Sequence, residues 1–175
     1  NAQALTYISA KAMVDVQTGE VVQSPLITID NGVITDVAQN KKPSMNKNDQ
    51  HIDLPELTLM PGLMDMHVHL TSDPTVSRSE RLSQSVPRMA IKAAHFAKKT
   101  LLAGFTTLRN VGAEGYSVIA VRDGINAGDI VGPRIWAAGP SLGITGGHCD
   151  NNRLPPELKY TSTGVADGPW AARVK

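Results

Sequence analysis

The stretch that decides the fold is PGLMDMHVHL, residues 61–70, in which two histidines stand one residue apart within an apolar run. The alternation after the Pro-Gly pair predicts a β-strand over residues 63–70. Residues two apart in a strand point to the same side, so Asp65, His67 and His69 share one face. Two imidazoles on one face can reach a single ion, and we interpret His67 and His69 as metal ligands rather than as buried strand residues.

On the C-terminal side of this strand, the pattern alternates between helices and strands. Apolar residues recur at helical spacing over 88–102 and 116–126, while short strand patterns occupy 105–109 and 134–138. This order predicts parallel strands joined by right-handed crossovers, as in an α/β barrel or a doubly wound sheet. The alternation therefore places the histidine-bearing strand in an α/β domain.

Residues 139–165 carry no periodicity, and a loop of that length is more often functional than idle. A further helix is predicted to begin at Pro169, with Asp167 as its cap. The opposite face of the first strand, made of methionine, valine and leucine, is expected to bury against helices.

The N-terminal side reads as a small antiparallel β unit. Residues 26–37 alternate around Asn31-Gly32, a strong hairpin signal because a type I′ turn requires positive φ at both central positions. Strands are also predicted over 5–12 and 57–60, with a polar loop over 39–50. We therefore divide the chain into two parts, residues 1–60 and residues 61–175.

Composition excludes several classes of partner. The 175 residues are 41% hydrophobic with a formal net charge of +1 and only 4% aromatic residues, which argues against nucleic-acid and membrane surfaces. The single cysteine, Cys149, excludes an internal disulfide framework. The residues Asn1 to Ala4 are either an ordinary start or the end of a signal peptide, so a periplasmic or secreted location and a cytoplasmic one both stay open.

Two further motifs carry candidate site residues. In GITGGHCDNN, residues 143–152, His148 and Asp150 offer groups for substrate binding, the alternative being a glycine-rich turn. In LRNVG, residues 108–112, Arg109 follows the second parallel strand, where it could bind a substrate carboxylate or form a structural ion pair.

The segments MPGLMDMHVHL, AGFTTLRNVG and GITGGHCD together resemble the amidohydrolase superfamily of metal-dependent hydrolases. The likeness is to its imidazolonepropionase-related branch, which includes zinc-dependent prolidase-like and Xaa-Arg/Xaa-Lys carboxypeptidase-like dipeptidases. The resemblance implies an α/β fold, a TIM-type (β/α)8 barrel with a β-sandwich side domain. This chain would hold the N-terminal sandwich strands and about the first three βα units.

The resemblance also implies roles for individual residues. His67 and His69 match metal ligands of the first barrel strand for one or two divalent ions, zinc above all, and Asp65 matches an acid that supports them. His148 matches a substrate-binding histidine. The remaining ligands and the catalytic aspartate are expected beyond Lys175, so we expect no catalytic residue within these residues and no activity from the isolated chain.

The implied reaction is hydrolysis of an amide bond by metal-activated water, in a dipeptide or at a C-terminal Arg, Lys or Pro residue. The alternatives are a cyclic-amide hydrolase (imidazolonepropionase-like) or deaminase of the same superfamily, and a non-catalytic scaffold with the same fold. The expected partners are a small-molecule or dipeptide substrate, the remainder of the same polypeptide and further copies in a homo-oligomer, without nucleic acid or membrane.

Overall fold

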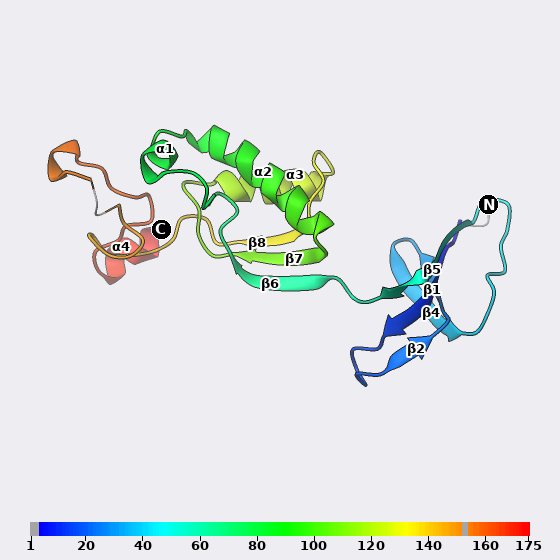
Figure 1. The fold of residues 1–175 in the computed structure, drawn as a ribbon. Helices are drawn as coiled ribbons and strands as arrows, with labels where there is room; N and C mark the ends of the chain where they lie inside the picture. The colour runs from blue at the N-terminus through cyan, green and yellow to red at the C-terminus, as the bar shows by residue number, and fades with distance from the viewer. Residues whose placement is uncertain (1–3, 152–153) are drawn as a thin grey trace. The chain divides into compact units, whose positions relative to one another are not determined.

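The computed structural model describes residues 4–151 and 154–175. They form two compact units, and the boundary between the units in the sequence lies between Pro61 and Gly62. The proposed end of a signal peptide falls largely on residues 1–3, and residue 152 closes the glycine-rich motif; both lie outside the described residues. Figure 1 shows the first unit as a β-sheet and the second as a sheet covered by helices. Each unit is described by itself below.

The first unit is a mixed sheet built around its first strand. That strand pairs with β2 and β3 antiparallel and with β5 parallel, while β4 pairs with β3. The prediction of a purely antiparallel unit was therefore wrong, since β5 returns from the polar loop in the same direction as β1. The strands are β1 (Thr6–Val14), β2 (Val21–Gln23), β3 (Pro25–Asp30), β4 (Val33–Gln39) and β5 (Gln50–Leu59).

The hairpin between β3 and β4 forms as predicted, because Asn31 and Gly32 adopt φ of 51° and 74°. The polar loop before β5 is also confirmed, but β5 starts at Gln50 and is longer than predicted. The full length of β5 was not predicted because Pro55 lies within it, and proline is uncommon inside strands. Pro55 lies where the pairing between β1 and β5 is interrupted, and there its missing N–H costs no ladder hydrogen bond.

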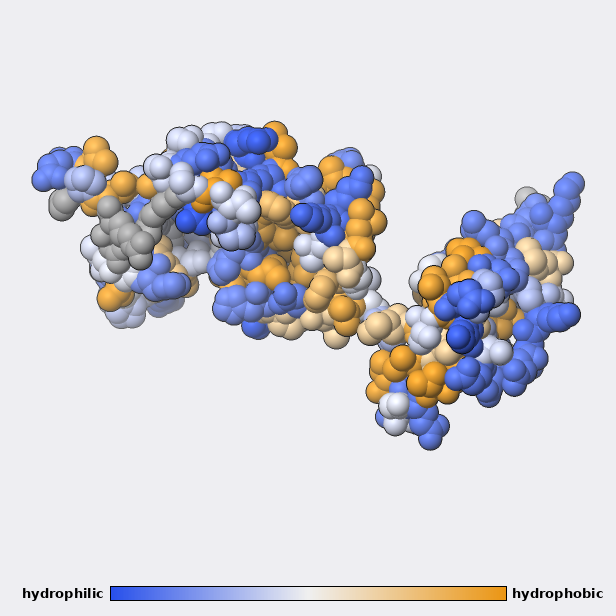
Figure 2. All heavy atoms as spheres, in the orientation of Figure 1, coloured by the Kyte–Doolittle hydropathy of each residue, from blue (hydrophilic) through white to orange (hydrophobic). Residues whose placement is uncertain are grey.

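Large apolar side chains stay exposed on the first unit. On β4, Val33, Ile34 and Val37 are 63%, 59% and 46% exposed, and Figure 2 shows apolar patches on the visible face of this unit. The described residues of the first unit form a single sheet. The β-sandwich implied by the resemblance therefore stays a prediction.

The second unit is a three-stranded parallel sheet in the order β6-β7-β8, which confirms the predicted strand–helix alternation. Helix α2 packs against β7 and α3, and α3 packs against β8 (Figure 1). The elements are β6 (Leu63–Val68), α1 (Arg78–Leu82), α2 (Val86–Leu102), β7 (Phe105–Asn110), α3 (Ser117–Ala127), β8 (Arg134–Ala137), the 3₁₀ turn η1 (Pro156–Leu158) and α4 (Pro169–Val174).

The core of the second unit lies between this sheet and its two long helices. Alanines of α2 meet larger side chains of β7, α3 and β8, a pairing of small with large residues that brings the helix close to the sheet. Helix α3 stops at Gly128, whose φ of 83° gives the left-handed cap that the sequence indicates. The buried cluster consists of Leu70, Ala93, Ala97, Leu108, Val118, Val121 and Ile135.

Two expectations about this unit were wrong. The apolar face of the predicted strand is buried only at its end: Leu70, just after β6, is in the core and Val68 is partly buried against it, while Met64 and Met66 are 68% and 40% exposed. The reason is that β6 is an edge strand and the helices lie over its neighbours. In addition, Asp167 does not cap α4, because Gly168 occupies that position and the carboxylate of Asp167 accepts hydrogen bonds elsewhere.

Among the described residues, no helix combines the length and the apolarity that crossing a membrane requires.

Candidate functional site

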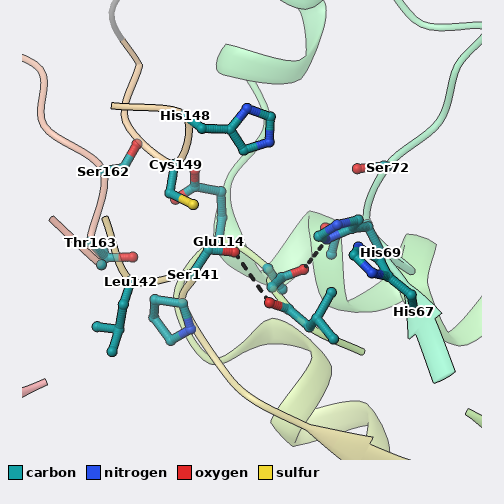
Figure 3. A pocket seen from close by; sticks show the side chains of 16 residues that line it. His67, His69, Ser72, Glu114, Ser141, Leu142, His148, Cys149, Ser162 and Thr163 are labelled. Atoms are coloured by element: carbon teal, nitrogen blue, oxygen red, sulfur yellow. Dashed lines mark hydrogen bonds between the residues drawn. The ribbon is translucent and has the colours of Figure 1, made fainter. Parts of the chain in front are cut away.

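The two histidines of the opening motif lie at the carboxyl end of β6. His67 belongs to the strand and His69 follows directly after its last residue, Val68. Their ring centres are 5.6 Å apart, with the ring planes at 70°. Figure 3 shows both imidazoles on the same side of a cavity. The strand alternation has therefore brought the two rings together, as their spacing in the sequence indicates.

The imidazole of His69 is held by a backbone carbonyl. Its Nδ1 lies 2.9 Å from the carbonyl oxygen of Gly112, in the loop after β7. A carbonyl oxygen can only accept, so Nδ1 donates, and in the neutral ring the lone pair stays on Nε2. Metal-binding histidines are commonly oriented in this way, through a hydrogen bond from the nitrogen that does not face the ion.

Asn110, the last residue of β7, links the loops that follow β6 and β7. Its side chain is fully buried, with Oδ1 accepting from the Leu70 N–H at 2.8 Å and Nδ2 donating to the Gly112 carbonyl at 3.1 Å. The carbonyl of Gly112 thus accepts from both Asn110 and His69. The buried amide of Asn110 therefore fixes the carbonyl that orients the His69 ring.

The residues present fit a metal ion, but they make only part of a site. Two imidazoles that share one ion, with bonds of about 2.0–2.1 Å, have ring centres roughly 5 Å apart, close to the 5.6 Å between His67 and His69. No group of three or more His, Cys, Asp or Glu side chains suited to a metal occurs within the described residues. A catalytic zinc usually takes three protein ligands, so the pair alone is insufficient.

Asp65 lies on the same strand and contacts the backbone of the pair. Its Oδ1 accepts from the N–H of His67 at 3.0 Å. This contact fixes the main chain at His67 rather than either imidazole ring, so support of the ligands by Asp65 stays a prediction.

The cavity beside the histidines has a volume of about 470 Å³. It brings His148, from the long loop after β8, to the same space as His67 and His69 (Figure 3). The cavity lies where the strands of the parallel sheet end, the position at which α/β folds build their active sites. The loop residues around it are Thr71, Ser72, Val111–Glu114, Pro140–Leu142, Cys149 and Ser162–Gly164.

Two carboxylates shape the loop that supplies His148. Asp150 accepts from the backbone N–H groups of Gly146, Asn151 and Ser162, and the bonds from Gly146 and then Ser162 are the main reason that its pKa is lowered. Asp167 accepts from the N–H and hydroxyl of Thr145, which lowers its pKa in the same way. The carboxylate of Asp150 thus stabilises the turn, and a role for Asp150 in substrate binding stays a prediction.

Arg109 is not among the residues that line the cavity. Its Nε donates to the carbonyl oxygen of Met66 at 2.6 Å, across the pair of strands β6 and β7. The structural contact is therefore with a backbone carbonyl rather than with an acid. A substrate-binding role for Arg109 stays a prediction that this geometry does not favour.

A second cavity, of about 570 Å³, adjoins the first and shares four residues with it, Thr71, Ser72, Glu114 and His148. It is also lined by Arg81, Leu82, Gln84, Val86, Met89, Asn151 and Tyr160. Sequence reasoning missed Glu114, although its place just after a parallel strand is the signal that drew attention to Arg109. Burial raises the pKa of the Glu114 carboxyl.

Comparison with known proteins places this geometry in a family. The model of the amidohydrolase family matches residues 58–169, well over half of the chain. Ochratoxinase from Aspergillus niger is 33% identical over 120 residues, which are 65% of this chain and 24% of that protein. The chain therefore spans about a quarter of this curated relative.

Solved structures give the same picture. A Xaa-Pro dipeptidase with bound methionine in its active site superposes with a TM-score of 0.80 at 35% identity, covering 97% of this chain and 44% of that one. A prolidase complexed with N-methylphosphonate-L-proline gives 0.70 at 28% identity, covering 83% and 34%.

Proposed function

The chain belongs to the amidohydrolase family, and from this premise we propose that it forms part of a metal-dependent hydrolase that cleaves an amide bond. The substrate we propose is a dipeptide or a peptide with a C-terminal Arg, Lys or Pro residue. The similarity to structures described as a Xaa-Pro dipeptidase and a prolidase supports this class. The metal we propose is zinc, as one or two ions, because imidazole nitrogens suit it.

The observation that carries the proposal is the histidine pair at the cavity. His67 and His69 lie 5.6 Å apart between ring centres and line the same space as His148. The Gly112 carbonyl fixes His69 so that Nε2 is left as a ligand nitrogen. Both imidazoles are exposed to the cavity rather than packed among apolar side chains, and such a pair favours metal coordination over a place in a hydrophobic core.

The chain's own residues would divide the work between binding and orientation. A bound divalent ion supplies an activated water and polarises the carbonyl of the amide. His67 and His69 would hold that ion, and His148, which lines the same cavity, would bind the substrate. The parallel sheet with helices packed on it also supports the larger fold that we propose, a TIM-type barrel with a β-sandwich side domain.

The proposal is tested by metal analysis and hydrolysis assays on the complete protein. We expect bound zinc in the wild type, and loss of metal with a fall in kcat/KM of more than about a hundredfold in His67→Ala and His69→Ala. His95→Ala is the matched control, because His95 is exposed on α2 and lines neither cavity. The panel contains dipeptides ending in Arg, Lys and Pro, together with cyclic imides and aminopurines.

Each outcome decides between the candidates. Hydrolysis of dipeptides supports the proposal, whereas turnover of cyclic imides or aminopurines alone replaces it with a cyclic-amide hydrolase or deaminase. A protein that neither binds zinc nor hydrolyses any member of the panel after zinc is added would be a scaffold with this fold. Equal metal content in His67→Ala and wild type would exclude the proposed site.

A further inference from the structure

A half-buried carboxylate, that of Glu114, lines both cavities and has no partner among the described residues. Glu114 lies in the loop after β7, and its backbone carbonyl accepts from the Ser117 hydroxyl at 2.9 Å, which ties the loop to the start of α3. No hydrogen bond or ion pair joins its carboxylate to any residue that the structure describes. A charge that loses water without gaining a partner is unfavourable, so a use in ligand binding has to be considered.

The Glu114 carboxyl is close to the second cavity. Tyr160 lines the second cavity but not the first. Burial, and then the charge of Glu114, raises the pKa of Tyr160. Tyr160 therefore stays a neutral hydroxyl, able to donate or accept a hydrogen bond. Glu114 itself lines both spaces, so a ligand that extends from the histidine pair into the second cavity passes this carboxylate.

A positively charged side chain also lines the second cavity. Arg81, on α1, is a lining residue, and no ion pair joins it to Glu114 within the described residues. Arg81 and Glu114 are the charged lining side chains there, and His148 is the remaining basic group. A space with one separated group of each sign complements a ligand that carries both a cation and an anion.

We propose that the second cavity is a subsite for a positively charged amino-acid moiety, with Glu114 receiving an ammonium or guanidinium group and Arg81 receiving a carboxylate. This inference rests on the proposed amide hydrolysis, because it assigns part of the same substrate. The cation has two possible sources, the α-ammonium group of a dipeptide or a basic side chain at its C-terminus. Glu114 would then determine specificity without taking part in the bond cleavage.

The inference is tested with Glu114→Gln in the complete protein, which keeps the shape of the side chain and removes its charge. The substrates are Ala-Lys, Ala-norleucine, whose C-terminal side chain carries no charge, and N-acetyl-Ala-Lys. If the basic side chain is the cation, Glu114→Gln should lower the preference for Ala-Lys over Ala-norleucine, measured as a ratio of kcat/KM values, by roughly ten- to a hundredfold. If the α-ammonium group is the cation, kcat/KM should fall by a similar factor for both dipeptides and the ratio should stay the same. Glu80→Gln, at an exposed position next to Arg81 on α1, should leave the ratio unchanged.

The acetylated substrate separates the two sources. If the basic side chain is the cation, N-acetyl-Ala-Lys keeps its dependence on Glu114; if the α-ammonium group is the cation, acetylation abolishes that dependence and Ala-norleucine loses rate in Glu114→Gln as well. An equal loss for all three substrates would show that Glu114 is only structural and would overturn the inference.

A binding measurement keeps the two proposals distinguishable. Isothermal titration of the complete protein with free lysine and with norleucine reports on the subsite even if no dipeptide is hydrolysed. Lysine binding that weakens in both Glu114→Gln and Arg81→Gln would support the subsite while the proposed reaction fails. Equal binding of lysine by wild type and both variants would reject the subsite whatever the reaction is.

Discussion

The buried amide of Asn110 provides the sharpest test of how the site is held. Replacing it by leucine keeps a side chain of similar size but removes both hydrogen bonds. The Leu70 N–H would then be buried without an acceptor, which costs about 1–3 kcal/mol. The Gly112 carbonyl would lose its hydrogen bond from Asn110 but would still accept from His69. The cost of this second lost hydrogen bond is therefore smaller, about 0.5–1.5 kcal/mol.

Together these losses predict that Asn110→Leu lowers the free energy of unfolding by roughly 1.5–4.5 kcal/mol. Urea titration of the complete protein measures this change. Asn126→Ala is the control, because Asn126 is exposed on α3 and its replacement should change stability by less than about 0.5 kcal/mol. A loss below about 1 kcal/mol in Asn110→Leu would refute the reasoning, since one unsatisfied buried N–H already accounts for that much.

Two further predictions concern the loops around the cavity. A Cβ at Gly164 would overlap the backbone carbonyl of Ser141, so Gly164→Ala should separate the two loop segments and weaken substrate binding, measured as a raised KM with unchanged zinc content. The pKa of Asp73 is lowered to about 2, mainly by the hydroxyl of Thr75 and less by Lys92. The stability that Asp73 contributes is therefore complete above pH 4 or so and is lost as the pH falls towards 2; a carboxyl resonance of Asp73 that titrates near 3.8 by NMR would contradict this.

The parts of the site that could be predicted are those set by local sequence. Strand alternation was sufficient to bring His67 and His69 to one side, and Asn31-Gly32 was sufficient to fix one hairpin. In each case a single dipeptide or a period of two residues determines the geometry, and no distant segment needs to be known.

The parts that could not be predicted depend on partners far away in the chain. The parallel pairing of β5 with β1 has no local signal. Asp150 looks like a ligand-binding carboxylate from its neighbours, but its role depends on the N–H of Ser162, which only the folded loop brings near. Arg109 donates to the backbone carbonyl of Met66. A contact with a backbone carbonyl cannot be predicted from a pattern of residue types.

The carbonyl of Gly112 shows how these distant contacts determine what the local motif can do. It accepts from His69 and from Asn110, and so connects the loops after β6 and β7. A Cβ on Gly112 would overlap the hydroxyl of Ser141 and lie 3.4 Å from Cε1 of His69, so this glycine also allows the loop after β8 to approach. The motif on β6 supplies two imidazoles, and the orientation of the His69 ring is set by the loop after β7, which packs against the loop after β8. The metal site that we propose is predicted from one strand, and we expect its affinity to depend also on residues such as Asn110 that carry no metal-binding chemistry of their own.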